Sequence, residues 1–201
     1  MNSIYTHVIP GILEKEWAEI EKKINIFRTF SDRIHIDFID GKLFQNFTFL
    51  DPAPFSQFSK ELYLEAHLMV EEPINYLDSF ARTGFKKFIG HVEKMSSQEE
   101  FVAKGELLGE VGLALDLPTP IEEIKVPFDD LDFVLLMSIH AGFSGQNFEQ
   151  SVIEKIKSLR AKTVIPIEID GGINDQTIMF LRHAGANIFV STSYITGPPN
   201  P

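Results

Sequence analysis

Eight short apolar segments alternate with amphipathic stretches along the chain, and this alternation restricts the fold more than any other feature. The segments expected as strands are His7–Leu13, Arg33–Asp37, Leu62–Met69, Lys87–Val92, Gly109–Leu115, Phe133–Met137, Val164–Asp170 and Asn187–Ser191. Strands that alternate with helices form a parallel sheet, and eight such strands can close a barrel. The sequence therefore predicts an α/β fold, a (β/α)8 TIM barrel, with an open doubly wound sheet as the alternative.

The segments between these strands have the spacing of helices that cover a barrel. In the first of them, Ile20, Ile24 and Phe27 recur on one helical face. The expected helices are Glu14–Phe27, Pro52–Phe58, Pro73–Thr83, Ser97–Leu108, Pro120–Val126, Glu149–Arg160 and Asp175–Ala184. Only Thr192–Pro201 follow the eighth strand and they end in GPPNP, so the last helix is expected to be missing or truncated. We expect residues 1–201 to form a single barrel domain.

The composition limits the partners of the chain. Its 201 residues are 44% hydrophobic, which suffices for a substantial core, and its formal net charge is −11. A field of that sign repels a phosphate backbone or an anionic membrane, although a small phosphorylated substrate needs only a few local donors. We therefore expect neither nucleic acid nor a membrane among its partners.

Two further features of the sequence concern the cellular compartment. There is no cysteine, which excludes disulfides and thiolate metal ligands. The start lacks the basic region and long apolar run of a signal peptide, and no segment approaches the roughly 20 apolar residues that span a bilayer. These features predict a soluble, cytoplasmic protein.

Histidines and aspartates stand at the ends of three expected strands. His35 and Asp37 are two residues apart in the second strand, so both point to one face and the neighbouring isoleucines point to the other. His67 lies in the third strand, and Asp170 ends the seventh. In a barrel these ends converge, and two imidazoles with two carboxylates could hold a divalent transition metal. The same residue types also occur as ordinary hydrogen-bonded residues, so the metal remains open at this point.

Glycine-rich turns follow the late strands. Gly142–Gly145 follows the sixth strand, Gly171-Gly172 the seventh, and Thr192-Ser193 the eighth. Such turns expose backbone N–H groups, and the late loops of a barrel often bind phosphate. A single glycine pair more often serves only a tight turn, but clustering after three adjacent strands favours phosphate binding.

The chain resembles the ribulose-phosphate 3-epimerases in four segments, HIDFIDG with Asn46–Phe49, AHLMVEEP, MSIHAGFSGQNF and IEIDGGIN. The segments occur in the same order and at compatible spacing, from Val8 to about Gly197. One DGG turn is common in barrels, whereas four segments in register are specific. The resemblance therefore strengthens the metal hypothesis.

What the resemblance implies is a metal-dependent 3-epimerase that interconverts D-ribulose 5-phosphate and D-xylulose 5-phosphate through an enediolate. Such an isomerase belongs to carbohydrate metabolism and the pentose phosphate pathway. The implied metal ligands are His35, Asp37, His67 and Asp170, for one divalent ion of Zn, Fe(II), Mn or Co, with Asp37 and Asp170 also as the acid/base pair. Implied contacts to substrate and phosphate come from His67, Gly142, Phe143, Ser144, Gly145, Gly171, Gly172, Thr192 and Ser193. Implied pocket-lining residues are Gly11, Ile39, Met69, Met137 and His140.

The chemistry of epimerisation agrees with this set. The reaction removes a carbon-bound proton next to a ketone and returns a proton to the opposite face. Two carboxylates on opposite walls can do this, and a metal would stabilise the negative charge that develops. Phosphate binding away from the reacting carbon would hold a phosphorylated ketose in register. Self-association into a homo-oligomer is a further expectation.

Several positions depart from the family pattern. Gly11 stands where serine is usual, Ile39 replaces a methionine, and Thr192 stands where glycine is normal. His140 replaces an asparagine, and Ser144 replaces a glycine in the loop after the sixth strand. None of these changes removes a proposed metal ligand, so they concern the identity of the sugar more than the reaction class.

Three other polar residues are expected to be structural. Glu168 faces the barrel interior, and a buried carboxylate needs a partner, so we expect an ion pair or hydrogen bond there and no catalytic role. His91 matches a family position that is not a ligand. His140 is within reach of the pocket, but a packing role is favoured.

The departures leave alternative functions open. One is 3-epimerisation of a ketohexose 6-phosphate such as allulose 6-phosphate. Another is a non-catalytic paralogue that binds a sugar phosphate or a metal without turnover. A metal-free decarboxylase or synthase is less favoured, because such sites usually employ a lysine and none stands at the end of the second, third or seventh strand.

Overall fold

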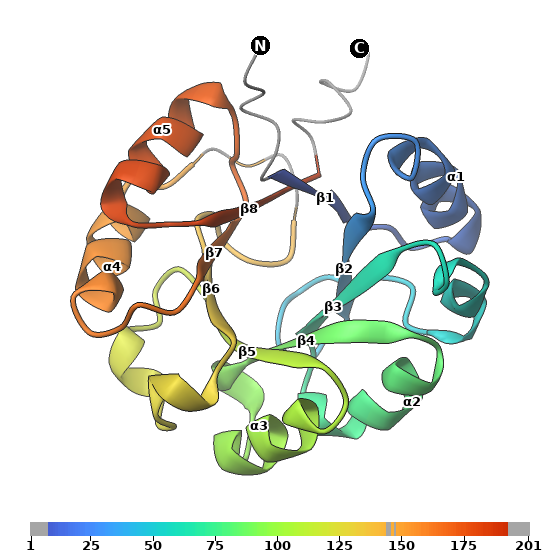
Figure 1. Cartoon of the computed structure of the whole chain (residues 1–201), viewed down its shortest axis with the longest axis horizontal. Helices are drawn as coiled ribbons and strands as arrows, with labels where there is room; N and C mark the ends of the chain where they lie inside the picture. The colour runs from blue at the N-terminus through green and yellow to red at the C-terminus, as the bar shows by residue number, and fades with distance from the viewer. Residues whose placement is uncertain (1–7, 144–145, 147, 193–201) are drawn as a thin grey trace.

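Parallel strands form a closed barrel in the computed structural model, which describes residues 8–143, 146 and 148–192 (Figure 1). The strands are β1 (Val8–Ile12), β2 (Arg33–Ile39), β3 (Tyr63–Met69), β4 (Phe85–His91), β5 (Glu110–Leu115), β6 (Phe133–Met137), β7 (Ile167–Asp170) and β8 (Ile188–Ser191). They pair in chain order, and β8 closes the barrel on β1. The predicted barrel is therefore confirmed and the open sheet is excluded.

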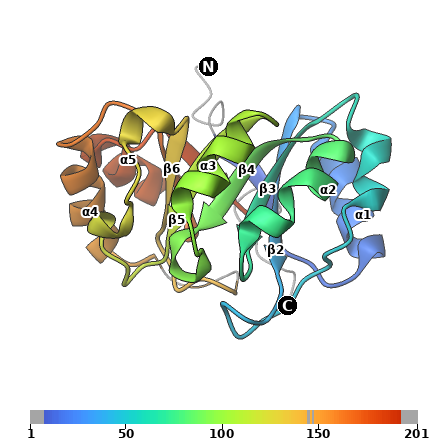
Figure 2. The same ribbon diagram turned by 90° about the horizontal axis from the view of Figure 1, so that it is seen from below.

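Helices surround this barrel (Figures 1 and 2). The α-helices are α1 (Trp17–Phe27), α2 (Leu77–Arg82), α3 (Gln98–Glu106), α4 (Ser151–Arg160) and α5 (Asp175–Ala184). Shorter 3-10 helices are η2 (Ala53–Phe58), η3 (Pro73–Asn75), η4 (Val92–Lys94), η5 (Ile121–Glu123) and η6 (Phe128–Asp130). Within the described part of the chain, no helix has the length and apolar character needed to cross a membrane. The helix expected to be missing after β8 concerns residues 193–201, which lie outside the described residues.

Two connections contain 3-10 turns where the sequence predicts α-helices. Pro52–Phe58 yields η2, and Pro120–Val126 yields only η5. Pro127 biases Val126 toward extended backbone and so opposes a helix that runs to Val126. The 3-10 form of η2 is not explained in this way, because Pro54 stands in its first turn, where the N–H has no partner within a helix. The predicted helix Pro73–Thr83 is divided into η3 and α2.

The strand β7 begins at Ile167, three residues later than predicted. Val164, where the prediction starts the strand, is 91% exposed. Pro166, directly before the strand, has no N–H to donate to a neighbouring strand. The strand therefore starts after the proline, whose carbonyl still accepts from Val134 N of β6 at 3.0 Å.

Side chains of the strands alternate between two hydrophobic layers. Ile34, Ile36 and Phe38 of β2 belong to the large core between the strands and the helices. A smaller cluster belongs to the barrel interior and comprises Ile39, Met69, Ile89, Ala114, Phe133, Leu135, Met137 and Ile139. His35 and Asp37 share the inward face with Ile39, as the two-residue spacing predicts.

A capping box at the start of α5 holds the loop that follows β7. Asn174 Oδ1 accepts hydrogen bonds from the backbone N–H groups of Gln176 and Thr177, both at 3.0 Å. Thr177 Oγ1 accepts from Asn174 N at 2.8 Å and donates to the carbonyl of Gly172 at 3.0 Å. These bonds fix the backbone directly after Asp170.

Candidate active site

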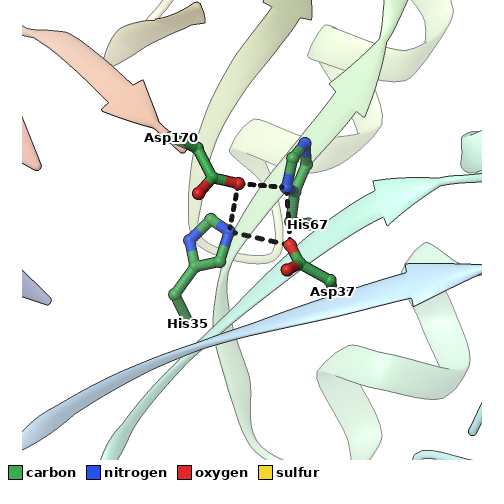
Figure 3. A group of neighbouring side chains, drawn as sticks. All are labelled: His35, Asp37, His67 and Asp170. Carbon is green, nitrogen blue, oxygen red and sulfur yellow. Dashed lines mark hydrogen bonds and ion pairs between the residues drawn. The ribbon is translucent and has the colours of Figure 1, made fainter. Parts of the chain in front are cut away.

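Four side chains from three strands meet in the barrel interior (Figure 3). His35 and Asp37 come from β2, His67 from β3 and Asp170 from the end of β7. All four are buried, and one ligand atom of each lies within 4.8 Å of the others. The structure thus brings together the four residues that the sequence singles out, hereafter the four-residue group.

The donor atoms of this group are spaced within about 0.4 Å of the distances in a tetrahedral metal site. His67 Nδ1 lies 2.9 Å from Asp37 Oδ1 and 3.5 Å from Asp170 Oδ2. His35 Nε2 lies 3.3 Å and 3.9 Å from the same two oxygens. Ligand atoms at the usual distances from a tetrahedral metal are about 3.3–3.6 Å apart. His35 Nε2 is also buried without a hydrogen bond to any described residue, so a metal would satisfy it. The group can therefore bind a divalent metal ion.

Electrostatics separates the two aspartates. Burial opposes the charge of Asp37, but the imidazoles of His35 and His67 beside it outweigh burial and lower the pKa of Asp37. Burial and the charge of Asp37 raise the pKa of Asp170. Burial also opposes charge on the two imidazoles, yet the carboxylates beside them raise the pKa of His35 and of His67. The protein groups thus keep Asp37 ionised and favour a proton at Asp170, a difference typical of acid/base pairs.

Buried charges lie behind His35. Lys87 Nζ donates to Glu65 Oε2 at 3.1 Å and to Glu168 Oε2. The other contacts of these carboxylates include His35 Nδ1, which is 3.4 Å from each. We call Lys87, Glu65 and Glu168 the charged triad. The geometry of His35 and the two glutamates would also suit a cation, but the ammonium of Lys87 already supplies one. The ion pair predicted for Glu168 is confirmed.

The far side of His67 has a different neighbour. His67 Nε2 lies 3.0 Å from His91 Nε2, and His91 Nδ1 lies 3.0 Å from Glu93 Oε2. His91 is fully buried. His91 is outside the four-residue group, and the sequence does not predict its contact with His67.

A small pocket opens on Asp37 and Asp170 of the four-residue group. The predicted site residues that line it are Asp37, Met69, Met137, Gly142, Phe143, Asp170, Gly171, Gly172 and Thr192. Lining residues that the sequence did not single out are Leu13, Ile139, Gln146 and Ser191. The pocket thus joins the two aspartates to the glycine turns.

Other predicted site residues lie elsewhere. Ser144, Gly145 and Ser193 are outside the described residues. Ile39 packs in the interior cluster. His140 is exposed and does not line the pocket of the described residues. The expected packing role of His140 is therefore wrong, because the turn after β6 leaves its side chain in solvent.

Gly11 packs against β8 and does not line the pocket. A Cβ atom on Gly11 would lie 3.0 Å from Thr192 Cγ2 and 3.1 Å from Val190 Cγ1. Gly11 replaces a usual serine, and Thr192 replaces a usual glycine. The two departures are therefore reciprocal, with side-chain volume moved from β1 to the end of β8.

Comparisons with known proteins agree with this geometry. The model of the ribulose-phosphate 3 epimerase family matches residues 7–196. A ribulose-phosphate 3-epimerase of Bacillus subtilis is 35% identical over 200 residues, 94% of this chain and 92% of that protein. The cytoplasmic isoform of ribulose-phosphate 3-epimerase from Oryza sativa is 32% identical over 202 residues, 96% of this chain and 89% of that protein.

A solved structure supports the fold. The tryptophan synthase complex from Pyrococcus furiosus includes a chain that aligns with a TM-score of 0.66 at 15% identity, over 92% of this chain and 86% of that chain. Identity this low is informative about the barrel alone. The family match and the two epimerases, in contrast, cover nearly the whole sequence. The chain therefore belongs to the ribulose-phosphate 3-epimerase family.

Proposed function

We propose that the chain interconverts D-ribulose 5-phosphate and D-xylulose 5-phosphate, a reaction of the pentose phosphate pathway. The observation that carries the proposal is that Asp37 and Asp170, from β2 and β7, line one pocket within a group that can bind a metal. Relatives named ribulose-phosphate 3-epimerase support this substrate pair. They give no support to a hexose phosphate or to a non-catalytic protein.

Asp37 and Asp170 are the proposed acid/base pair. Epimerisation removes the proton at carbon 3 from one face and delivers a proton to the other. Asp37, which its histidine neighbours keep ionised, is present in the carboxylate form that can accept a proton. Asp170, with its raised pKa, is suited to donate one. The two roles exchange in the reverse direction.

His35, Asp37, His67 and Asp170 are the proposed ligands of one divalent metal ion, and Zn, Fe(II), Mn and Co all suit this donor set. When bound, the ion supplies positive charge that stabilises negative charge on the substrate oxygens. Met69, Met137 and Ile139 form an apolar part of the pocket wall. This part of the wall limits access of water and so strengthens electrostatic interactions at the reacting carbon.

The loops after β6, β7 and β8 are the proposed phosphate site. Gly171 and Gly172 have φ of 105° and 59°. A Cβ on Gly171 would lie 2.4 Å from Ile139, and one on Gly172 would lie 2.9 Å from Phe148. Only glycine fits both positions, which lets backbone N–H groups come close to a ligand. The residues proposed to bind substrate or phosphate are His67, Gly142, Phe143, Ser144, Gly145, Gly171, Gly172, Thr192 and Ser193.

We further propose a cytoplasmic location. The rice relative is named as a cytoplasmic isoform, and the absence of cysteine is compatible with a reducing compartment. Self-association into a homo-oligomer stays a prediction. Light scattering of the purified chain measures its oligomeric state.

The experiment that tests the proposed function is an assay of the purified chain on D-ribulose 5-phosphate with a coupled readout of xylulose 5-phosphate. It is run before chelation, after chelation, and after return of each candidate metal. We expect turnover that is lost on chelation and restored by at least one metal. A folded, metal-loaded chain without turnover would contradict the pentose assignment, and allulose 6-phosphate is then the next substrate to assay.

A further inference from the structure

His67 makes contacts through both ring nitrogens, and the two nitrogens face different partners. Nδ1 faces Asp37 at 2.9 Å and Asp170 at 3.5 Å. Nε2 faces His91 Nε2 at 3.0 Å. The two imidazole rings are tilted by only 18°, with centroids 5.1 Å apart. The ring centroids are farther apart than the two Nε2 atoms by about the width of one ring. The two rings therefore meet end to end, and the Nε2 atom of each ring points at the Nε2 atom of the other.

One nitrogen of this contact must carry a proton and the other must not. His91 Nδ1 lies 3.0 Å from Glu93 Oε2, and a carboxylate only accepts, so His91 Nδ1 carries a proton. In a neutral His91, Nε2 is then bare and accepts the N–H of His67 Nε2. Without a metal, His67 Nδ1 donates to the Asp37 carboxylate at 2.9 Å. Because His91 holds a proton on Nε2 of His67, Nδ1 is the nitrogen that gives up its proton to a metal, and the Nε2–H tautomer that results is the one that a metal ligand at Nδ1 requires.

Glu93 is itself held in place, so the chain of hydrogen bonds has a fixed end. Its Oε1 accepts the backbone N–H of Asp116 at 2.7 Å, directly after β5. Both carboxylate oxygens are thus occupied by donors. On its other side, His91 meets the ring of Phe44 edge-on, with centroids 5.1 Å apart. Packing and hydrogen bonding together restrict rotation of the His91 ring.

We propose that His91 and Glu93 are positioning residues that hold His67 in the Nε2–H tautomer, with Nδ1 free to bind a divalent metal. The inference rests on the metal site of the proposed function. Glu93 orients His91, and His91 orients His67. Neither residue lines the pocket formed by the described residues, so both act through His67.

Binding of Zn²⁺ to the full chain, measured in competition with a chelator, tests this role. His91→Phe removes the acceptor and keeps a ring of similar shape. Glu93→Gln keeps the size of the side chain, but its amide N–H2 group must face either the N–H of His91 Nδ1 or the backbone N–H of Asp116, and both of these are donors. We expect each to weaken Zn²⁺ binding by about 10–100-fold. His91→Gln, whose amide oxygen can replace Nε2 as the acceptor, is expected to recover most of the affinity.

A matched control separates positioning from simple loss of stability. Gln98 is buried, donates to the carbonyl of Glu123 at 2.7 Å and accepts from Lys125 N at 2.8 Å, away from His67. Gln98→Ala is expected to lower the thermal stability without changing Zn²⁺ affinity. Folded His91→Phe and Glu93→Gln chains that bind Zn²⁺ within about threefold of the unaltered chain would overturn the proposal.

Imidazole ¹⁵N NMR of the metal-free chain gives a second readout that does not depend on metal. We expect a proton on Nε2 of His67 in the unaltered chain, besides the Nδ1 proton donated to Asp37, and a smaller share of His67 with an Nε2 proton in His91→Phe. A His67 that carries no proton on Nε2 in the unaltered chain would overturn the positioning role. If the unaltered chain binds no Zn²⁺, Co²⁺, Mn²⁺ or Fe²⁺, the metal site of the proposed function fails, while the NMR result still decides the role of His91.

Discussion

The two histidines of the four-residue group are supported in different ways. His35 is backed by the charged triad, in which the ammonium of Lys87 lies between two carboxylates inside the barrel. His67 is backed by His91, and the only formal charge of that support stands at the far end, on Glu93. One histidine is held by buried groups of opposite charge and the other by a directional chain of hydrogen bonds.

Depth in the barrel explains this difference. Glu65, Lys87 and Glu168 are at most 1% exposed, so water cannot solvate their charges and a buried cation must balance the carboxylates. The side chain of Glu93 is 18% exposed and accepts a backbone N–H, so it needs no cation. The charged triad therefore contributes both to the stability of the fold and to the placement of His35. The support of His67 can change without leaving an unpaired charge in the core.

Removal of Lys87 should have the largest effect on stability. Lys87→Met leaves the carboxylates of Glu65 and Glu168 without their shared ammonium. We expect a loss of about 3–5 kcal/mol in the free energy of unfolding, measured by urea denaturation of the metal-free chain. The control is Lys157→Met, which removes only an exposed pair with Glu154 and should change little. Equal stability of Lys87→Met and the unaltered chain would remove the basis of the comparison.

The pH dependence of stability should reveal the same charges. Burial raises the pKa of Glu65, but the charge of Lys87 and the hydrogen bond from His35 outweigh it and hold that pKa below its ordinary value of 4.5. Burial opposes the charge of Lys87 as well, but the two carboxylates raise the pKa of Lys87 above 10.5. A lowered carboxyl pKa contributes stability that is present above pH 4.5 and is lost as the pH falls toward the folded value. The raised lysine pKa contributes below pH 10.5 and is lost above it.

Unfolding of the metal-free chain from about pH 7 down to about pH 3 measures the acidic half of this window. We expect the stability of the unaltered chain to fall below pH 4.5, and Glu65→Gln to show a shallower decline. Parallel profiles for the two chains would mean that Glu65 is not held ionised by the triad.

His91→Phe should destabilise the fold less than Lys87→Met. It leaves the N–H of His67 Nε2 without an acceptor but leaves no fully buried charge unpaired. We expect a cost of about 2 kcal/mol in the same urea experiment. A cost as large as that of Lys87→Met would show that the support of His67 also holds the fold together, and the distinction between the two supports would be lost.

Period-two alternation made much of the site predictable from the sequence. The spacing of His35 and Asp37 places both inside the barrel once β2 is recognised as a strand. The same rule predicts that Glu168 is buried and needs a partner, but it does not name Lys87. Lys87 follows Lys86, which is exposed, and a pair of lysines is typical of a surface. Only the register of β3, β4 and β7 shows that Lys87 meets both glutamates.

The contact of His91 illustrates a second limit of the sequence. Inward orientation at the end of β4 follows from alternation with Ile89, but the nitrogen that His91 faces depends on ring rotation and on the loop that carries Glu93. The local sequence pattern indicates neither the rotation of the His91 ring nor the path of the loop that carries Glu93. The 3-10 turn η5 was missed for a simpler reason, since Pro127 shortens a segment whose apolar spacing alone is compatible with a helix.

The reciprocal pair Gly11 and Thr192 provides the smallest predicted effect, and it depends on volume alone. Gly11→Ser places a side chain against Thr192 and Val190, so we expect a loss of about 1 kcal/mol in stability. Thr192→Gly in the same chain should recover most of it. A double-mutant cycle by urea denaturation measures the coupling, and strictly additive effects would show that the two departures are independent. This pair gives the effect of packing alone, with which the effects of Lys87→Met on buried charge and of His91→Phe on a directed hydrogen bond are compared.

The central claim is that Asp37 and Asp170 act on opposite faces of carbon 3, and turnover in D₂O tests it most directly. The unaltered, metal-loaded chain should incorporate deuterium at carbon 3 of both epimers. Asp37→Asn and Asp170→Asn retain an oxygen that can bind metal, and their metal content is measured alongside. Each should lose epimerisation by at least about a thousandfold, and each should retain exchange in one epimer only, a different epimer for each variant. Epimerisation within tenfold of the unaltered chain in either metal-loaded variant would contradict the two-aspartate account.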